Sequence, residues 1–195
     1  MWPILLLSVV TLGVVVERLL FLFQESRSRD HAAVLRVFQL VEHGRIDEAA
    51  RAAAGSSDMV ARVLAGGLEH RETSLNDALL EGASVELDRY NRGLVVLDTA
   101  VTLGPLLGLL GTVTGMMKAF NIVGGTDLAG KQAILTGGIS ECLIAVTFGL
   151  LVAIIAILPL NYLNARLEKA RRILEAAMTR LELLAAKHRG SEVAA

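Results

Sequence analysis

The sequence predicts an all-α, polytopic membrane protein with three transmembrane helices and long helices that extend into the cytoplasm. Hydrophobic residues make up 53% of the 195 residues, which is too many for an ordinary soluble domain. Charged residues make up 20% and gather in two stretches, residues 24–93 and 164–195. Each apolar run that remains is at least as long as the roughly 20 residues that a helix needs to cross a bilayer.

The first predicted transmembrane helix covers residues 1–23. It is apolar except for two hydroxyl side chains and the adjacent pair Glu17 and Arg18. The run lacks the basic start and the small-residue cleavage site of a signal peptide, so we expect it to be retained. Glu17 and Arg18 are expected to anchor its cytoplasmic boundary, where Arg18 can extend toward the headgroups and Glu17 can pair or cap.

Residues 24–93 form a predicted cytoplasmic insert of four short helices, separated by capping residues and glycines. Its histidines are scattered, and it shows no nucleophile beside a base and no phosphate-binding loop, so we do not expect an enzyme. The first expected helix starts at Ser28 or Asp30 and stops at Gly44, and the second covers Asp47 to Ala54 and stops at Gly55. The third covers Ser57 to Glu69, and the fourth starts at the capping pair Ser74 and Asp77.

Residues 94–123 form the second predicted transmembrane helix, which has a cytoplasmic extension because a helix of this length spans about 45 Å. Pro105 is expected to bend it, with Thr102 bonding the freed carbonyl group. Thr112 borders a glycine stripe, and its hydroxyl group either bonds its own backbone or faces a pore. The stripe, along which another backbone can approach closely, consists of Gly104, Gly108, Gly111 and Gly115.

A short periplasmic turn at residues 124–132 leads into the third predicted transmembrane helix, residues 133–163. This helix carries Gly137, Glu141, Ala145, Gly149 and Ala153 at a spacing of four. A carboxylate inside an apolar span is costly, so Glu141 is expected to face a protein interface or a pore. The single cysteine, which neighbours Glu141, offers neither a disulfide framework nor a metal ligand set.

Pro159 and Asn161 are expected to mark the far end of the third span, and residues 164–195 form an amphipathic cytoplasmic helix and tail. Of the 19 Lys and Arg residues, ten lie between Arg18 and Arg92 and seven lie from Arg166 onward. The positive-inside rule therefore places the insert and tail in the cytoplasm and the N-terminus in the periplasm. A net charge of −1 without a long basic run argues against a nucleic-acid partner.

The two later spans also carry a family resemblance. LDTAVTLGPLLGLLGTVTGMMKAF, GGISECLIAVTFGLL and LPLNYLNARLEKAR closely resemble the second and third membrane helices of the MotA/TolQ/ExbB proton channel family, and its ExbB branch most of all. The motif ERL matches the end of the family's first helix. The resemblance implies a subunit of the bacterial inner membrane that forms a ring, in the family a pentamer.

The resemblance also implies a function and partners. Such a ring surrounds the transmembrane helices of an ExbD- or TolR-type single-span partner, and a TonB- or TolA-type protein can join it. It couples the proton motive force to work across the envelope, with sodium as the alternative ion and without a cofactor. The process powered can be TonB-type uptake, Tol-type envelope maintenance or motility.

By the match, Thr112 in GTVTG corresponds to the family's pore threonine, and Glu141 in GISE corresponds to the acid of its third helix. The family usually has threonine five residues after this acid, where this sequence has Val146 followed by Thr147. The predicted proton pathway therefore comprises Thr112, Glu141 and Thr147. It either lacks one hydroxyl group or contains a slightly rotated helix.

Two alternative functions stay open. A membrane ring scaffold that conducts nothing would tolerate Val146. A MotA-like motility stator is the other alternative, although MotA proteins have four spans where this chain has three. The residues with predicted roles in helix packing are Gly104, Gly108, Gly111, Gly115, Gly137, Ala145 and Gly149.

Overall fold

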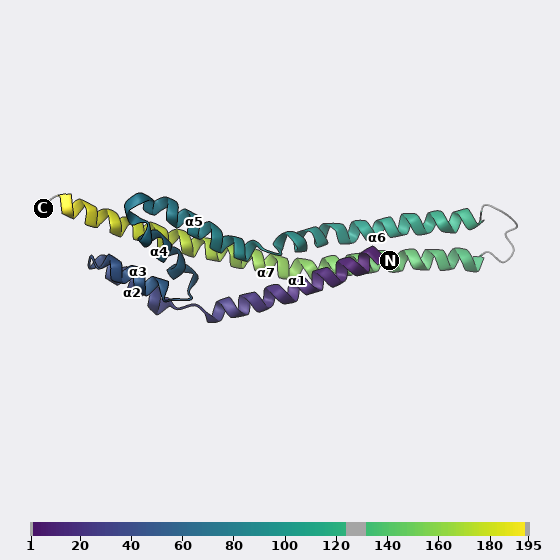
Figure 1. Ribbon diagram of the computed structural model, residues 1–195. Coiled ribbons are helices and arrows are strands. Elements are labelled where there is room, and N and C mark those ends of the chain that lie inside the picture. The colour runs from purple at the N-terminus through teal and green to yellow at the C-terminus, as the bar shows by residue number, and fades with distance from the viewer. Residues whose placement is uncertain (1, 124–131, 194–195) are drawn as a thin grey trace. The chain divides into compact units, whose positions relative to one another are not determined.

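The computed structural model describes residues 2–123 and 132–193, and within them it contains seven helices and no strand (Figure 1). The predicted turn at 124–132 lies outside the described residues except for its last position. The helices are α1 (Trp2–Arg27), α2 (His31–Glu42), α3 (Ile46–Ala54), α4 (Met59–Glu69), α5 (Arg71–Asn91), α6 (Leu94–Val123) and α7 (Gln132–Val193).

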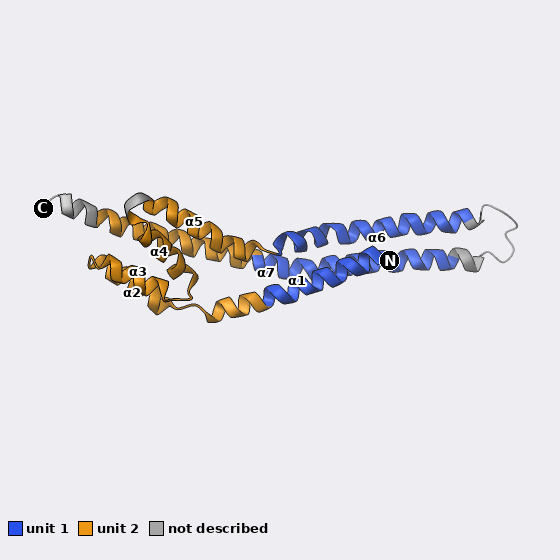
Figure 2. Ribbon diagram, in the orientation of Figure 1, with its two compact units in different colours: residues 1–19, 93–163 blue, residues 20–92, 164–195 orange. Residues whose placement is uncertain are grey.

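The chain divides into two compact units (Figure 2). Unit 1 contains residues 1–19 and 93–163, and unit 2 contains residues 20–92 and 164–195. Three of the described helices are long and apolar enough to cross a membrane, in agreement with the predicted fold class. They lie in Trp2–Arg27, Ser74–Asn121 and Thr136–Lys187.

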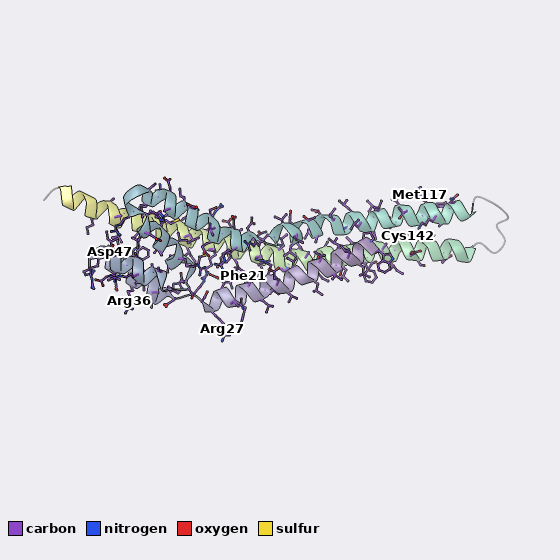
Figure 3. All side chains as sticks on the ribbon, in the orientation of Figure 1. Phe21, Arg27, Arg36, Asp47, Met117 and Cys142 are labelled. Carbon is purple, nitrogen blue, oxygen red and sulfur yellow. The ribbon has the colours of Figure 1, made fainter. Side chains whose placement is uncertain are left out.

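Unit 1 exposes large apolar side chains, as a surface that contacts lipid does. Trp2 is 84% exposed, Leu158 is 69% exposed and Met117 is 67% exposed (Figure 3 labels Met117). Its small buried cluster joins Ile4 of α1 to Ala145 and Val152 of α7. The first span therefore packs on the third through a narrow contact and leaves most of its apolar surface exposed.

Helix α6 begins and ends where the sequence predicts and contains Pro105 in its interior. The prediction for Thr102 is wrong. Its hydroxyl group donates to the backbone carbonyl groups of Asp98, at 3.3 Å, and Thr99, at 3.0 Å. The carbonyl group that Pro105 deprives of a donor belongs to residue 101, four positions earlier. The Thr102 hydroxyl group thus donates to backbone carbonyl groups in the preceding turn of its own helix, as threonine in a helix commonly does.

Helix α7 continues through Pro159 and Asn161 as far as Val193, so these residues do not end a helix. Proline removes one backbone hydrogen bond and strains the preceding turn, which bends a helix more often than it ends one when both flanks favour helix. The segments before and after residue 163 are parts of one 62-residue helix. The boundary of the membrane at that residue stays a prediction.

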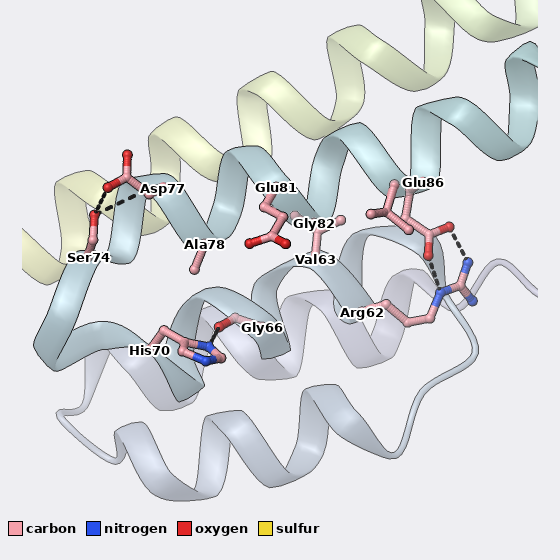
Figure 4. Close-up of a pocket in the computed structure, with 11 residues that line it drawn as sticks. Arg62, Val63, Gly66, His70, Ser74, Asp77, Ala78, Glu81, Gly82 and Glu86 are labelled. Atoms are coloured by element: carbon pink, nitrogen blue, oxygen red, sulfur yellow. Dashed lines mark hydrogen bonds and ion pairs between the residues drawn. The ribbon is translucent and has the colours of Figure 1, made fainter.

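Side-chain caps begin two helices of unit 2, α2 and α4. The Asp30 carboxylate accepts a hydrogen bond from the Ala33 backbone N–H at 3.0 Å, which confirms one predicted start. The third short helix starts at Met59 and is capped by Asp58, whereas the sequence placed its start at Ser57. Ser74 has non-helical angles (φ −162°, ψ 93°) inside α5, and its hydroxyl group accepts from the Asp77 N–H, as the predicted cap requires (Figure 4).

The core of unit 2 gathers apolar residues from several short helices around α7. Leu64, Leu79 and Leu174 are 0 to 1% exposed within it. The rings of Phe21 and Tyr90 meet edge to face, with centroids 5.5 Å apart. Burial raises the pKa of Tyr90 to about 12, an effect to which the nearby Glu25 charge adds.

Candidate functional site

The glycine stripe of α6 packs directly against the backbone of α7. A Cβ atom added to Gly104 would lie 2.7 Å from the Gly149 carbonyl oxygen, and one added to Gly149 would lie 2.5 Å from the Gly104 carbonyl oxygen. A Cβ at Gly108 would lie 3.1 Å from Val146 Cα. Only glycine permits this approach, so the two helices form a tight seam of backbone contacts. We call this contact the α6–α7 seam.

Farther along the seam, side chains of α7 fill the space that glycines of α6 leave. A Cβ at Gly111 would lie 2.8 Å from the Ala145 Cβ, and one at Gly115 would lie 2.5 Å from the Cys142 sulfur. Cys142, labelled in Figure 3, is 4% exposed. Cys142 therefore acts as a small packing residue in the seam.

Glu141 and Gly137 lie off the α6–α7 seam. An α-helix turns about 100° per residue, so each step of four residues advances about 40° further round the axis. The row that contains both residues therefore winds away from α6 in one direction. Glu141 is exposed, and a Cβ at Gly137 would meet nothing within 4 Å. The carboxylate thus stands on an open side of the helix pair.

Thr112 and Glu141 occupy the same level of the helix pair. Cys142, the residue next to Glu141, lies with its sulfur 3.4 Å from the Thr112 carbonyl oxygen, to which its S–H can donate. The structure therefore brings the backbone of one predicted pathway residue beside the neighbour of the other. The contact between Cys142 and the Thr112 backbone is polar and joins two apolar helices. The residues that carry the Thr112 hydroxyl group and the Glu141 carboxyl group are therefore at this contact or next to it in sequence.

The hydroxyl groups of both predicted pathway threonines donate to their own helices. Thr112 Oγ1 lies 2.6 Å from the Leu109 carbonyl oxygen, and Thr147 Oγ1 lies 2.8 Å from the Leu143 carbonyl oxygen. Of the two readings left open for Thr112, this geometry matches the backbone-bonded one. A hydroxyl oxygen that donates in this way still has lone pairs with which to accept.

Val146 and Thr147 lie on different sides of α7. Val146 is partly buried and contacts Gly108 in the α6–α7 seam, whereas Thr147 is exposed. Six residues separate Glu141 from Thr147, which places them about 120° apart around the helix. The structure therefore does not bring Thr147 onto the face of Glu141, and a hydroxyl group at position 146 would point toward α6.

Arg18 is buried inside unit 1. The sequence instead predicts that it extends toward the lipid headgroups at the membrane boundary. It is 6% exposed, and its guanidinium group donates to the Glu17 carboxylate at 2.7 Å. A Cβ added to Gly93 would lie 3.1 Å from Arg18 Nε. Glu17 itself is exposed. Arg18 thus packs against the turn that precedes α6.

Asp98 is a second carboxylate within the apolar helices, and sequence patterning did not single it out. It is exposed near the start of α6, where an acid looks like an ordinary end of a span. Its helical position could have indicated a role, because Asp98 lies 14 residues before Thr112 on the same helix. That separation corresponds to about 21 Å along the axis and about 40° around it. Asp98 and Thr112 therefore share one face of α6.

Comparison with known proteins supports the family resemblance found in the sequence. The profile of the MotA/TolQ/ExbB proton channel family matches residues 55–179. A Synechocystis protein named as ExbB-like 1, of biopolymer transport, is 34% identical over 193 residues, which cover 94% of this chain and 74% of that protein. TolQ of the Tol-Pal system of Haemophilus influenzae is 37% identical over 81 residues, 42% of this chain and 35% of that protein.

A third relative agrees with the first two. The biopolymer transport protein ExbB of Xanthomonas campestris pv. campestris is 33% identical over 94 residues, which cover 48% of this chain and 37% of that protein. The match to the family profile includes both helices of the α6–α7 seam. This chain is a membrane protein that belongs to the MotA/TolQ/ExbB proton channel family.

Proposed function

We propose that this chain is the ring-forming subunit of a motor that the proton motive force drives in the bacterial inner membrane. Copies of the chain surround the transmembrane helix of an ExbD- or TolR-type partner and couple proton flow to work across the envelope. The names of the relatives support this proposal, since they describe biopolymer transport and the Tol-Pal system. The N-terminus lies in the periplasm, and the tail lies in the cytoplasm.

The observation that carries the proposal is the exposure of Glu141 beside the α6–α7 seam. Backbone contacts hold α6 and α7 together as one stiff wall, because the glycines leave no space for sliding side chains. A carboxyl group exposed on such a wall inside a bilayer needs a polar neighbour. A partner helix or a file of water in the centre of a ring supplies that neighbour.

The chemistry that this wall can perform is proton relay. The Glu141 carboxyl group can accept a proton from one side of the membrane and release it to an acid on the partner helix. The Thr112 hydroxyl oxygen can accept a hydrogen bond while its own O–H donates to the Leu109 carbonyl oxygen. Protonation neutralises the partner's acid, which then leaves its contact and moves past the wall.

The test is proton flux into liposomes that contain the chain and its partner under an imposed membrane potential. Glu141→Gln keeps the size of the side chain but removes the exchangeable proton, and we expect flux to fall at least about tenfold. Glu69→Gln is the matched control, since Glu69 is an exposed acid at the end of α4. Full flux through Glu141→Gln liposomes would remove Glu141 from the mechanism.

Thr114, two residues after Thr112, provides a matched control for substitutions at Thr112. The hydroxyl group of Thr114 also donates to the preceding turn, at 2.8 Å from the Leu110 carbonyl oxygen. We expect Thr112→Val to slow proton flux severalfold and Thr112→Ser to restore it, whereas Thr114→Val leaves flux unchanged. Equal effects of the two valine substitutions would assign Thr112 to helix packing alone.

The ring scaffold without conduction is supported by one observation. Val146 lies in the α6–α7 seam, and both pathway threonines donate to their own backbones, so neither of these two hydroxyl protons is directed away from its helix. Liposomes with and without the partner separate the two functions. A ring that assembles with its partner but passes no protons under a membrane potential is a scaffold.

A further inference from the structure

Two grooves flank α7 within unit 2. One, of about 500 Å³, lies among α2, α4 and α7, and we call it the basic groove; it is lined by Arg29, His31, Leu35, Phe38, Ala177 and Arg180. The other, of about 510 Å³, lies between α5 and α7, and we call it the acidic groove; it is lined by Leu80, Ser84, Asp88, Glu168, Arg171 and Glu175.

The two grooves use opposite faces of α7. Residues nine apart on a helix lie about 180° from one another around its axis. Glu168 in the acidic groove is nine residues before Ala177 in the basic groove, and Arg171 is nine before Arg180. One helix therefore presents a groove on each side of unit 2.

The grooves carry opposite charges at their rims. Arg29, which is half-buried, and Arg180, which is exposed, line the basic groove. Asp58 also lines that groove, but it is 4% exposed and its carboxylate accepts from the backbone N–H groups of Asp30 and Val60. Its charge is thus turned inward to two helix starts, and the accessible charge of the basic groove is positive.

In the acidic groove three carboxylates face one guanidinium group. Arg171 lies 3.9 Å from both Glu168 and Glu175, while Asp88 is exposed. The surplus of carboxylates leaves this groove with a net negative charge. Both grooves also expose a large apolar side chain, since Leu35 is 54% exposed in the basic groove and Leu80 is 55% exposed in the acidic groove.

We propose that the acidic groove of one copy of this chain docks on the basic groove of a second copy. The contact buries Leu80 and Leu35 at its centre and pairs Asp88 with Arg180 at its rim. Because the two surfaces differ and lie on opposite sides of α7, every docked copy offers a free groove to the next. Such head-to-tail contacts close into a ring when the rotation between copies permits. This inference rests on the proposed ring and names its cytoplasmic contact.

Disulfide trapping between two differently tagged copies tests this contact. Cys142→Ala removes the only cysteine, after which one copy carries Leu35→Cys and the other carries Leu80→Cys. Oxidation of membranes that contain both copies is expected to give a heterodimer through Cys at these positions. The matched control replaces Leu80→Cys with Val85→Cys, since Val85 is 58% exposed but lines the groove between α4 and α5. We expect at least about fivefold less heterodimer with that control.

Charge reversal gives an independent readout. Asp88→Arg and Arg180→Asp each place like charges across the contact, and we expect each to speed the exchange of fluorescently labelled subunits by about three- to tenfold. The two changes together restore opposite charges and should return exchange toward the wild-type rate. Glu69→Arg and Arg36→Glu, which change exposed charges outside both grooves, should leave it unchanged (Figure 3 labels Arg36).

The outcomes separate this contact from the proposed function. A ring that passes protons but gives no heterodimer above the Val85→Cys control overturns the contact and leaves the motor function intact. Failure of the double charge reversal to restore exchange also overturns it. Heterodimer formation by copies that pass no protons with their partner supports the contact and removes the motor function. Copies that stay monomeric in the membrane overturn both.

Discussion

Arg18 packs against Gly93, so that the end of the first span contacts the turn from which the second begins. A Cβ added to Gly93 would lie 3.1 Å from Arg18 Nε and 3.0 Å from a methyl carbon of Val14. Gly93 has a φ of +76°, in the left-handed region. Backbone conformation and side-chain packing therefore both demand glycine at this turn.

Gly93→Ala is expected to destabilise the protein by about 1–2 kcal/mol from backbone conformation alone, with the contacts to Val14 and Arg18 adding to the loss. Unfolding of the purified protein in detergent measures the change. Gly13→Ala is the matched control, since a Cβ there would meet nothing within 4 Å in the same unit. Equal stability of the Gly93 and Gly13 variants would contradict the packing of Arg18 against this turn.

The α6–α7 seam predicts a second contrast between glycines. Gly149→Ala would force a Cβ to within 2.5 Å of the Gly104 carbonyl oxygen, so the backbones must separate. We expect a loss of about 1–3 kcal/mol and a measurable increase in the α6–α7 distance by spin-label spectroscopy. Gly137→Ala, on the same helix and outside the seam, should change neither quantity.

The seam also shows how far sequence reasoning reached. The steps of four, three and four in α6 keep one face toward a partner, and the structure places all four of its glycines against α7. The uniform steps of four in α7 do not keep one face, because each adds about 40° of rotation. The exposure of Glu141 on the α6–α7 pair was thus available from arithmetic, whereas its environment in an assembly was not.

Other features depend on contacts distant in sequence. The burial of Arg18 required knowing that a glycine 75 residues later lies beside it, which no local pattern reveals. The continuation of α7 through Pro159 required weighing one lost hydrogen bond against two long helical flanks. By contrast, the bounds of α6 followed from its apolar run and neighbouring polar residues, which are local signals.

Asp58 predicts the cost of losing a shared cap. Its carboxylate accepts from the N–H of Val60, at 2.8 Å, and from the N–H of Asp30, at 3.0 Å, and therefore serves two helix starts. Asp58→Ala is expected to cost about 2–3 kcal/mol in detergent unfolding, because the buried N–H of Val60 and the part-buried N–H of Asp30 both lose their acceptor. Asp30→Ala removes only an exposed cap and should cost about 1 kcal/mol. A similar loss for both would argue against the double role of Asp58.

The ion pair between the partly exposed Arg62 and the buried Glu86 predicts a loss of stability in acid (Figure 4). Burial tends to raise the pKa of Glu86, but the hydrogen bond from Arg62 and the charges of Arg62 and Arg89 outweigh it, so the pKa lies below its ordinary value of 4.5. A carboxyl group with a lowered folded pKa stabilises the protein at neutral pH. That stability is lost as pH falls below about 4.5 and through the folded pKa.

Glu86→Gln checks this dependence. The variant should be less stable than the wild type at pH 7, because Arg62 then loses its hydrogen-bonded carboxylate and keeps only Glu25, at 4.0 Å, as an ion-pair partner. Its stability should fall less steeply than that of the wild type as the pH is lowered from 5 toward the folded pKa. Melting temperatures of both proteins across that range give the comparison. Parallel curves would show that other carboxyl groups account for the acid sensitivity.

We predict that Asp98 is a second carboxylate on the proposed proton pathway, in addition to Glu141. It is exposed on the same face of α6 as Thr112, about 21 Å nearer the start of the helix. If protons leave toward the cytoplasm along this face, Asp98→Asn should lower flux in partner-containing liposomes at least about tenfold without changing subunit assembly. Asp98→Glu keeps an exchangeable proton and should retain most of the flux. A variant Asp98→Asn that conducts normally, beside an inactive Glu141→Gln, would place the exit of the pathway on another face.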